Sequence, residues 1–372
     1  MWFSIIRATE RTQIQFIFFP MFAIMILVRL YGSRPYSATA AETENEEITM
    51  NSTERVRATI LGQPTDRQPI YGWVFADLSN EINARWGSVA AFEDTYEFDI
   101  AHLFGGPPCF DTELINSIAP LGTDELTPDL LVDQPILKDP ADPASYEGLR
   151  QSLAHHKARG RFCYVQTPGF FEHFNGIFGI ENHLMWLALY PEELGELYRR
   201  QAEWTIRFAD HCIDLGVDMI HISDDWGAQK DLMFSPELWR ELIYPNFKRV
   251  VDHVHSRGAF CSLHSDGCIL KAADGIVDLG LDVVHPWQES AGMSYDLYLD
   301  KYQNRFGILG GVCVQTALGM LNREELEKEI RRVFGKLRGK RWIVCTTHFV
   351  SNLCSMDDLE FAYDLIYKLA RE

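Results

Sequence analysis

The segment CSLHSDG, residues 261–267, places His264 and Asp266 two positions apart, directly after a short apolar run, and ends on a glycine. Imidazole and carboxylate side chains are common in active sites, so this pair could lie at the rim of one. The same residues could instead form a helix cap or turn in which the histidine has no chemical role. Other parts of the chain help to separate these two interpretations.

Polar residues and glycines also follow several other apolar runs of the chain. Any one of them has an ordinary explanation, because a histidine at a strand end is often structural and an aspartate often caps the next helix. Their recurrence at the same end of successive runs favours a polar pocket. The residues concerned are Gln166, Thr167, Asp224, Asp225, Trp226, His264, Asp266, His285, Gly310, Gly311 and His348.

Short β-branched or aromatic runs alternate with longer amphipathic segments from Met50 onward. This alternation predicts a parallel sheet with helical crossovers, and seven or eight such units predict a single closed (β/α)₈ barrel. In such a barrel the strand ends converge on one face, where catalytic groups are found. The expected strands are 69–74, 161–166, 217–223, 259–265, 281–286, 306–311 and 341–347, with another near 97–104.

The expected helices cover 191–215, 236–257, 268–279, 322–337 and 356–371. The second of these has a clear start, with Ser235 as the cap, Pro236 at the first helical position and Glu237 in the first turn. An open, doubly wound sheet is the alternative fold. That fold normally has a glycine-rich phosphate turn after its first strand, and GWVFADLS is not such a turn.

Composition and charge restrict the class of partner. The 372 residues are 47% hydrophobic and carry 53 acidic against 34 basic side chains, for a formal charge of −19. Nucleic acids and anionic membrane surfaces require dense lysine and arginine, so neither is an expected partner. The eight cysteines have no paired spacing, which predicts reduced thiols and a cytoplasmic protein.

An N-terminal extension, residues 1–49, differs from the barrel expected over 50–372. Two arginines, an apolar run at 16–28 and small residues at 38–40 are typical of a secretory signal, which would make the protein an exported one. A mis-assigned start codon upstream of Met50 would give the same pattern. Both alternatives stay open.

Four segments of the chain occur in a distinctive order and spacing. They are the 35 residues DDWGAQKDLMFSPELWRELIYPNFKRVVDHVHSRG, followed by LHSDG, LDVVHPWQ and GILGGV. In these segments the chain resembles the uroporphyrinogen decarboxylase superfamily, from about Thr53 to the end. That superfamily contains decarboxylases of haem synthesis and zinc-dependent methyltransferases that act with corrinoid proteins. The resemblance implies a (β/α)₈ barrel but does not choose between the reactions.

Decarboxylation of uroporphyrinogen is the first of the reactions implied. Enzymes of that kind hold an octa-carboxylate tetrapyrrole with arginines that follow the first strand and with an aspartate. This chain offers Asp77 but no arginine before Arg85. Guanidinium groups are the natural partners of many carboxylates, so their absence argues against that substrate.

The methyltransferase branch implies a zinc site with a His-x-Cys pair and a third ligand near the last strand. This chain has His264 and Asp266 at the first place, with aspartate where cysteine is usual, and His348 at the second. Residues two apart on an extended segment point the same way, so His264 and Asp266 could bind one ion. Zn²⁺ accepts such a set, although an oxygen ligand leaves the identity of the metal open.

The resemblance also implies roles for other residues and partners. A metal-bound thiol or alcohol group of a small-molecule substrate would become a nucleophile and exchange a methyl group with a corrinoid held by a partner protein. A homodimer is also expected. We predict that Asp225, Asp77 and His285 are catalytic and that Gln166, Gln229, Trp287 and Gly311 shape the substrate pocket, although Gln229 and Trp287 could equally serve packing. A barrel that has lost catalysis and acts as a binding protein is the third possibility, motivated by the missing cysteine.

Overall fold

The computed structural model describes residues 49–118 and 126–372. Contacts between residues group Glu47–Glu372 into one compact unit. The predicted N-terminal extension lies almost entirely outside the described residues, and so does the choice between a signal and a mis-assigned start. Within the described part of the chain, no helix has both the length and the apolar character needed to cross a membrane.

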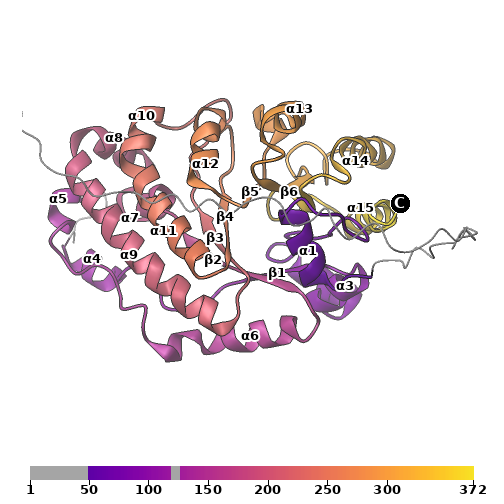
Figure 1. Cartoon of the computed structure of the whole chain (residues 1–372), viewed down its shortest axis with the longest axis horizontal. Coiled ribbons are helices and arrows are strands. Elements are labelled where there is room, and N and C mark those ends of the chain that lie inside the picture. Colours follow the sequence, from indigo (N-terminus) through magenta and orange to yellow (C-terminus); the bar gives the residue numbers. More distant parts are fainter. Residues whose placement is uncertain (1–48, 119–125) are drawn as a thin grey trace, which may run out of the picture. The chain divides into compact units, whose positions relative to one another are not determined.

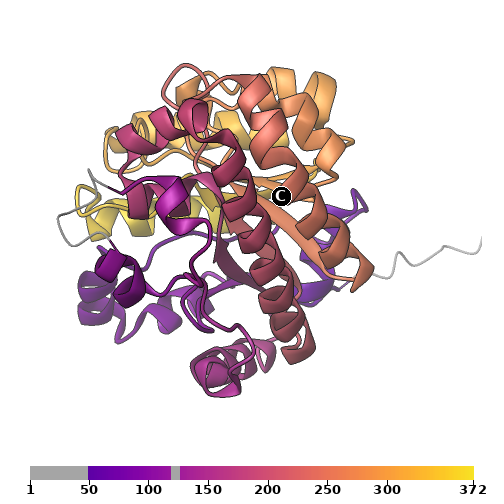
Figure 2. The ribbon, with the colours of Figure 1, turned by 90° about the vertical axis from the view of Figure 1, so that its left-hand side faces the viewer.

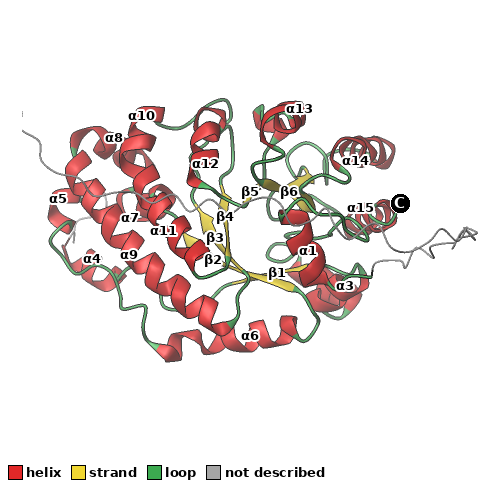
Figure 3. Cartoon of the chain, viewed as in Figure 1, coloured by secondary structure: helices red, strands yellow, loops and turns green. Residues whose placement is uncertain are grey.

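A curled, seven-stranded parallel sheet forms the inner layer, and helices cover its outside (Figure 3). The strands follow one another in chain order, as expected for repeated crossover units. Five of them are buried along their whole length, which agrees with the continuous apolar runs in the sequence. The strands are β1 (Ile100–Leu103), β2 (Phe162–Pro168), β3 (Met219–Ser223), β4 (Phe260–His264), β5 (Val283–His285), β6 (Gly307–Val312) and β7 (Trp342–Thr346).

The strand expected at 69–74 differs from the prediction. It forms only a single parallel bridge, between Ile70 and Val344 of β7. Tyr71 N donates to Val344 O at 2.8 Å, and Asp99 N, just before β1, donates to Ile70 O at 2.8 Å. The segment therefore contacts both edges of the sheet without a ladder, and seven of the eight expected strands are present.

The helices lie on the outer side of the sheet, and α9 and α11 lie side by side there (Figure 1 and Figure 2). The longer α-helices are α1 (Ser52–Ile60), α2 (Ser79–Trp86), α3 (Val89–Thr95), α4 (Thr112–Ile118), α6 (Glu147–Lys157), α7 (Phe171–Phe178), α8 (Ile180–Leu189), α9 (Pro191–Leu215), α11 (Tyr244–Ser256), α12 (Ala273–Leu279), α14 (Arg323–Leu337) and α15 (Met356–Leu369). Short helical turns are α5 (Pro128–Leu131), η2 (Pro143–Tyr146), α10 (Pro236–Leu238), η3 (Trp239–Ile243), η4 (Leu270–Ala272), η5 (Glu289–Ala291), α13 (Tyr295–Leu297) and η6 (Tyr298–Tyr302).

The helix expected at 236–257 shows how local sequence signals are realised. The Ser235 side chain accepts a hydrogen bond from Leu238 N, and Pro236 occupies the first turn, as predicted. The helix then continues through a π-helical turn, Trp239–Ile243, into α11. The segment expected at 268–279 is shorter than predicted, because α12 begins only at Ala273.

A buried ion cluster joins the first helix to the start of the sheet. The fully buried carboxylate of Asp99 accepts hydrogen bonds from Arg55 Nη1 at 2.5 Å, Arg67 Nη1 at 2.7 Å and Ile70 N at 2.8 Å. Both guanidinium groups are themselves only 7% exposed. Removal of the carboxylate would take a buried partner from both cations, although Arg55 would keep its pair with Asp66.

We predict that Asp99→Ala lowers the free energy of unfolding by about 3–5 kcal/mol, because breaking a buried ion pair leaves an uncompensated charge. Urea-induced unfolding measures the loss. The matched control is Glu324→Ala, which breaks an exposed pair with Lys328 and should cost less than about 1 kcal/mol. Equal effects of the two substitutions would contradict a structural role for the cluster.

Candidate metal centre

Three predicted ligands from two distant parts of the chain meet at the carboxyl ends of β4 and β7. His264, Asp266 and His348 each offer one ligand atom, and these atoms all lie within 4.8 Å of one another. His348 Nε2 is 3.9 Å from Asp266 Oδ2, and the two imidazole centroids are 5.9 Å apart. The His264 side chain is only 5% exposed, whereas Asp266 and His348 are 30% and 45% exposed, so the cluster is open on one side.

Hydrogen bonding determines which nitrogen of His264 faces this cluster. His285 lies on the neighbouring strand. Its Nε2 is 3.1 Å from Thr346 O, and its Nδ1 is 2.7 Å from His264 Nδ1. Burial lowers the pKa of His264 to about 4 and that of His285 well below its usual value, so both rings are neutral at pH 7. A carbonyl only accepts, so His285 carries its hydrogen on Nε2 and accepts through Nδ1. His264 must then donate from Nδ1, which leaves a free lone pair on its Nε2.

The position of Asp266 depends on close contact between two loops. A side chain on Gly267, whose φ is +76°, would place its Cβ 2.4 Å from Gly227 O, and a Cβ on Gly227 would lie 2.4 Å from Asp266 O. Only glycines allow this approach. Asp266 N donates to Asp225 Oδ1 at 2.8 Å, while Asp266 Oδ1 is buried and has no hydrogen-bond partner.

Carboxylates concentrate negative charge beside the free imidazole nitrogen. Asp225 Oδ1 is 3.6 Å from His264 Nε2, and Glu172 at the start of α7 accepts from Ser223 Oγ at 2.9 Å. Burial, together with the charges of Asp225 and Glu172, raises the pKa of Asp266 to about 7. Burial also raises the pKa of Glu172. A divalent cation would relieve this repulsion and would provide the missing partner of Asp266 Oδ1, so the site fits a metal ion.

The ring of Trp73 forms the inner wall of the site. Its centroid lies 4.3 Å from that of His285, 5.2 Å from that of His264 and 5.8 Å from that of His348. The indole donates to the hydroxyl of buried Tyr164 at 2.9 Å, which fixes its orientation. An aromatic wall of this kind keeps water away from the inner side of the imidazoles.

A second histidine group lies deeper, because His221, His264 and His285 also have ring nitrogens within 4.8 Å of one another. The mutual hydrogen bond of the last two occupies one nitrogen of each. His221 bonds Ser262 Oγ through Nδ1 at 2.7 Å, and its Nε2 has no partner. Of this group only His285 bonds a proposed ligand, and we assign the group no ion of its own.

The other predicted catalytic residues lie at different depths. Asp225 is 34% exposed and adjoins the ligands. His285 is fully buried, so it contacts His264 rather than the open side of the site. Asp77 is exposed on the loop after 69–74. Burial lowers the pKa of His348, and the charges of Asp225 and Asp77 act in the opposite direction.

The predicted substrate-binding residues are dispersed. Gln166 lines a cavity between the loop after β1 and helices α7 and α9. Gln229 is exposed, and its Nε2 donates to Ser290 O at 2.9 Å. Trp287 is buried against aromatic rings of η6 and donates to Ser294 O at 3.2 Å, so packing explains its position without a ligand.

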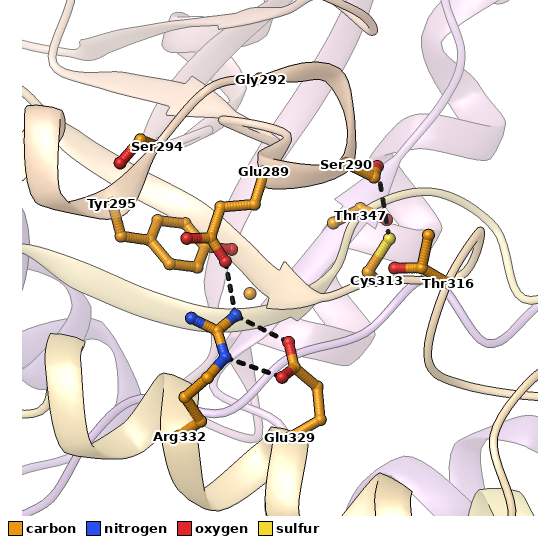
Figure 4. Close-up of a pocket in the computed structure, with 11 residues that line it drawn as sticks. Glu289, Ser290, Gly292, Ser294, Tyr295, Cys313, Thr316, Glu329, Arg332 and Thr347 are labelled. Atoms are coloured by element: carbon orange, nitrogen blue, oxygen red, sulfur yellow. Dashed lines mark hydrogen bonds and ion pairs between the residues drawn. The ribbon is translucent and has the colours of Figure 1, made fainter.

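Gly311 lines a separate cavity of about 350 Å³, between η5, α13, α14 and the end of β6 (Figure 4). Arg332 on α14 points into this cavity and bonds Glu329 at 2.7 Å and Glu289 at 2.5 Å. Because two carboxylates already bind the guanidinium, it is not available to an anionic substrate. The structure thus brings together the predicted ligands and Asp225, but places Gln166 and Gly311 in two different cavities.

Sequence reasoning missed Glu172, Trp73 and Thr346. Glu172 could have been found, since it lies in the first turn of the helix that follows β2, the strand that contains Gln166. Trp73 lies inside a predicted strand, and nothing in the sequence indicates that its ring turns toward the histidines. Thr346 acts through its backbone carbonyl, for which no residue type is a signal.

The fold and the ligand set define a parallel α/β protein with a candidate metal centre at the carboxyl ends of its strands. The model of the uroporphyrinogen decarboxylase (URO-D) family matches residues 175–369, more than half of the chain, and the chain therefore belongs to this family. This confirms the resemblance seen in the sequence. No curated protein matches the chain.

A solved structure has the same fold. A methyltransferase from Methanosarcina mazei is 14% identical, covers 85% of this chain and 98% of its own, and has a TM-score of 0.64. A B12-independent methionine synthase from Shewanella sp. W3-18-1 is 11% identical over 61% of this chain and 65% of its own, with a TM-score of only 0.40. At these identities the likeness concerns the fold alone.

We predict that His285→Ala weakens metal binding by about 10- to 100-fold, because partners that orient a ligand imidazole typically contribute this much. Competition with a chromophoric chelator measures the affinity.

The matched control is His221→Ala, which removes an equally buried ring 6.2 Å from that of His264 but no hydrogen bond to a proposed ligand. Its affinity should stay close to that of the native protein. If both variants lost the metal to the same degree, the orienting role of His285 would be refuted.

Proposed function

We propose that this URO-D family protein is a metal-dependent methyltransferase, with zinc bound by His264, Asp266 and His348. The observation that carries the proposal is the meeting of these three ligand atoms beside a buried, unpartnered carboxylate oxygen. Two imidazoles and a carboxylate, with a further position open toward solvent, are typical of catalytic zinc sites. The methyltransferase fold of the Methanosarcina mazei protein is compatible with this activity.

The metal would supply Lewis acidity. It would lower the pKa of a thiol or alcohol group of the substrate, so that this group would lose its proton at neutral pH. The chain's own residues position that group. His264 presents Nε2 because His285 holds its other nitrogen, and the partly exposed sides of Asp266 and His348 leave room for the substrate.

Asp225 and Glu172 are suited to handle the proton that leaves the substrate. Asp225 Oδ1 is held by the amide of Asp266, and the carboxylate is partly exposed, so it can accept a proton from a group bound at the open side. Glu172 is held by the hydroxyl of Ser223, and burial raises its pKa, which makes the carboxylate a stronger proton acceptor.

The remaining parts of the proposal concern partners and enclosure. The methyl group would be exchanged with a corrinoid carried by a partner protein, which would dock on the face where the strands end. Residues 69–74 would serve as the eighth barrel position, supported by their hydrogen bonds to both sheet edges. The substrate is a small molecule, and the chain would act as a homodimer.

Decarboxylation of a porphyrinogen has less support from the described residues. Arg85, the first arginine after 69–74, is held by Asp357 at 2.6 Å and Glu360 at 2.6 Å on α15. A substrate with many carboxylates would also meet the negative group formed by Asp225, Asp266 and Glu172.

Protein purified without chelators should contain about one zinc ion per chain, and His264→Ala should abolish it, because the most buried ligand is lost. Methyl transfer from methylcobalamin to a small thiol should fall to background in the same variant. Elemental analysis and the absorbance of methylcobalamin measure the two effects. His155→Ala, at an exposed histidine of α6, is the control. Full activity of metal-free protein would end the proposal.

Asp266→Cys should bind zinc more tightly than the native protein, because a thiolate is a softer ligand than a carboxylate. Asp266→Asn, which keeps the shape but removes the charge, should bind zinc more weakly. Chelator competition measures both affinities. If Asp266→Asn bound zinc with the same affinity as the native protein, residue 266 would not contact the metal.

A further inference from the structure

The cavity of about 350 Å³ between η5, α13, α14 and the end of β6 contains none of the three proposed metal ligands (Figure 4). Its volume is within the range of small-molecule sites, at the lower end. Two of its eleven lining residues are glycines, and Tyr295 is the only one with a large apolar surface. The cavity is therefore suited to a ligand that is held mainly by hydrogen bonds.

The hydroxyl of Tyr295 is an open hydrogen-bonding group of this cavity. The residue is only 2% exposed, and its hydroxyl has no hydrogen-bond partner among the described residues. The hydroxyl is not completely enclosed by protein atoms, and the space that the residue lines is this cavity. Burial raises its pKa, and the charge of Glu289 raises it further, so the group keeps its proton at pH 7. Because buried polar groups are nearly always satisfied, the open hydroxyl points to a ligand.

The guanidinium of Arg332 is paired with two carboxylates but keeps free donors. Its Nε donates to Glu329 at 2.7 Å, and its Nη2 donates to Glu329 at 2.7 Å and to Glu289 at 2.5 Å. Its Nη1 makes no hydrogen bond within residues 49–118 and 126–372. Two carboxylates against one guanidinium would repel an anion, and a cation would have to compete with Arg332 for them. The free Nη1 can still donate to an uncharged oxygen.

Hydroxyl and thiol groups border another side of the cavity (Figure 4). Cys313 Sγ donates to Ser290 Oγ at 3.6 Å, and Ser290 Oγ donates to Gln315 Oε1 at 3.3 Å. Thr316 is exposed, and in the part of the chain that the structure describes its hydroxyl has no partner. The open groups of the cavity are thus two hydroxyls and a guanidinium nitrogen. A ligand hydroxyl can bond either kind, because it both donates and accepts.

We propose that this cavity binds a small, uncharged molecule with several hydroxyl groups, of the size of a cyclic polyol or a monosaccharide. One ligand hydroxyl bonds the hydroxyl of Tyr295, a second accepts from Arg332 Nη1, and a third bonds Thr316 Oγ1. The site does not depend on a bound metal, and the inference goes beyond the proposed function.

The end of β7 connects this cavity to the candidate metal centre. Thr347 lines the cavity and directly precedes the proposed ligand His348. Thr347 Oγ1 accepts from Val314 N at 3.1 Å, which joins the segment after β7 to the segment after β6. A ligand in the cavity therefore contacts the segment that carries one of the metal ligands.

The test uses the full-length protein and ligand-observed saturation-transfer NMR with four probes of similar size: D-glucose, myo-inositol, D-gluconate and cyclohexanol. We expect saturable binding of D-glucose and myo-inositol. D-gluconate adds a negative charge, and cyclohexanol keeps only one hydroxyl. Each should bind more weakly by roughly tenfold or more, the effect of losing at least one hydrogen bond.

Tyr295→Phe should weaken the binding of the two polyols by roughly tenfold, because it removes one hydrogen bond to the ligand. The variant should fold normally, since the lost hydroxyl has no protein partner. The matched control is Tyr302→Phe, which removes the hydroxyl of another buried tyrosine, bonded to Asp274 at 3.0 Å and outside the cavity. Its affinity for the polyols should stay close to that of the native protein.

Absence of saturable binding of either polyol to the native protein would overturn the proposal, and so would equal binding of D-gluconate or cyclohexanol. These comparisons need no variant to fold. Equal effects of Tyr295→Phe and Tyr302→Phe would overturn it as well. His264→Ala should leave polyol binding intact. If the native protein contains no zinc but binds the polyols, the metal proposal fails and the cavity proposal stands.

Discussion

The carbonyl oxygen of Thr346 can only accept hydrogen bonds, and this restriction determines which nitrogen of His264 is free. The hydrogen of His285 is directed to that carbonyl, so His285 accepts from His264, and the lone pair of His264 turns toward Asp225 and the other ligands. The chain of bonds begins in the backbone of β7, crosses β5 and ends on β4. The orientation of the most buried ligand is therefore a property of three strands of one sheet, β4, β5 and β7, whose spacing is set by backbone hydrogen bonds.

The acidic side of the site has a different physical basis. Asp266 lies in a turn, and it is held where it is because Gly227 and Gly267 let two loops touch backbone to backbone. The same contact brings its carboxylate close to those of Asp225 and Glu172, an arrangement that burial makes costly in the absence of a cation. The rings of His264 and His285 are thus held by the sheet, whereas Asp225 and Asp266 are held by loops. Such a division is common in barrels, where loops after the strands carry the chemistry and strands provide rigidity.

Much of this arrangement could be predicted from the sequence, and the exceptions have identifiable causes. The alternation of apolar runs and amphipathic segments located seven strands, and the recurrence of polar residues at their ends brought His264, Asp266 and His348 together. The run at 69–74 reads as a strand, but only Ile70 forms a bridge, because the amide of Trp73 donates to the side chain of Thr346 and does not extend the ladder. Trp287 was assigned to a pocket from its position after a strand, whereas its ring turns into an aromatic cluster. Side-chain direction after a strand end, and the role of a backbone carbonyl, are decided by tertiary packing and leave no mark in the pattern of residue types.

The weakly paired segment at 69–74 also has a consequence for how the interior can change over evolutionary time. Between the strands of the sheet, spacing is set by main-chain ladders that point substitutions hardly alter. The segment at 69–74 has fewer backbone bonds and is attached in part through hydroxyl groups: Trp73 N donates to Thr346 Oγ1 at 2.9 Å, and Tyr363 OH donates to Tyr71 O at 3.2 Å. Exchange of a single threonine or tyrosine can therefore shift the segment, and with it the indole that borders the histidines. A single substitution at this segment can therefore change the space beside the histidines, while the rest of the sheet keeps its dimensions.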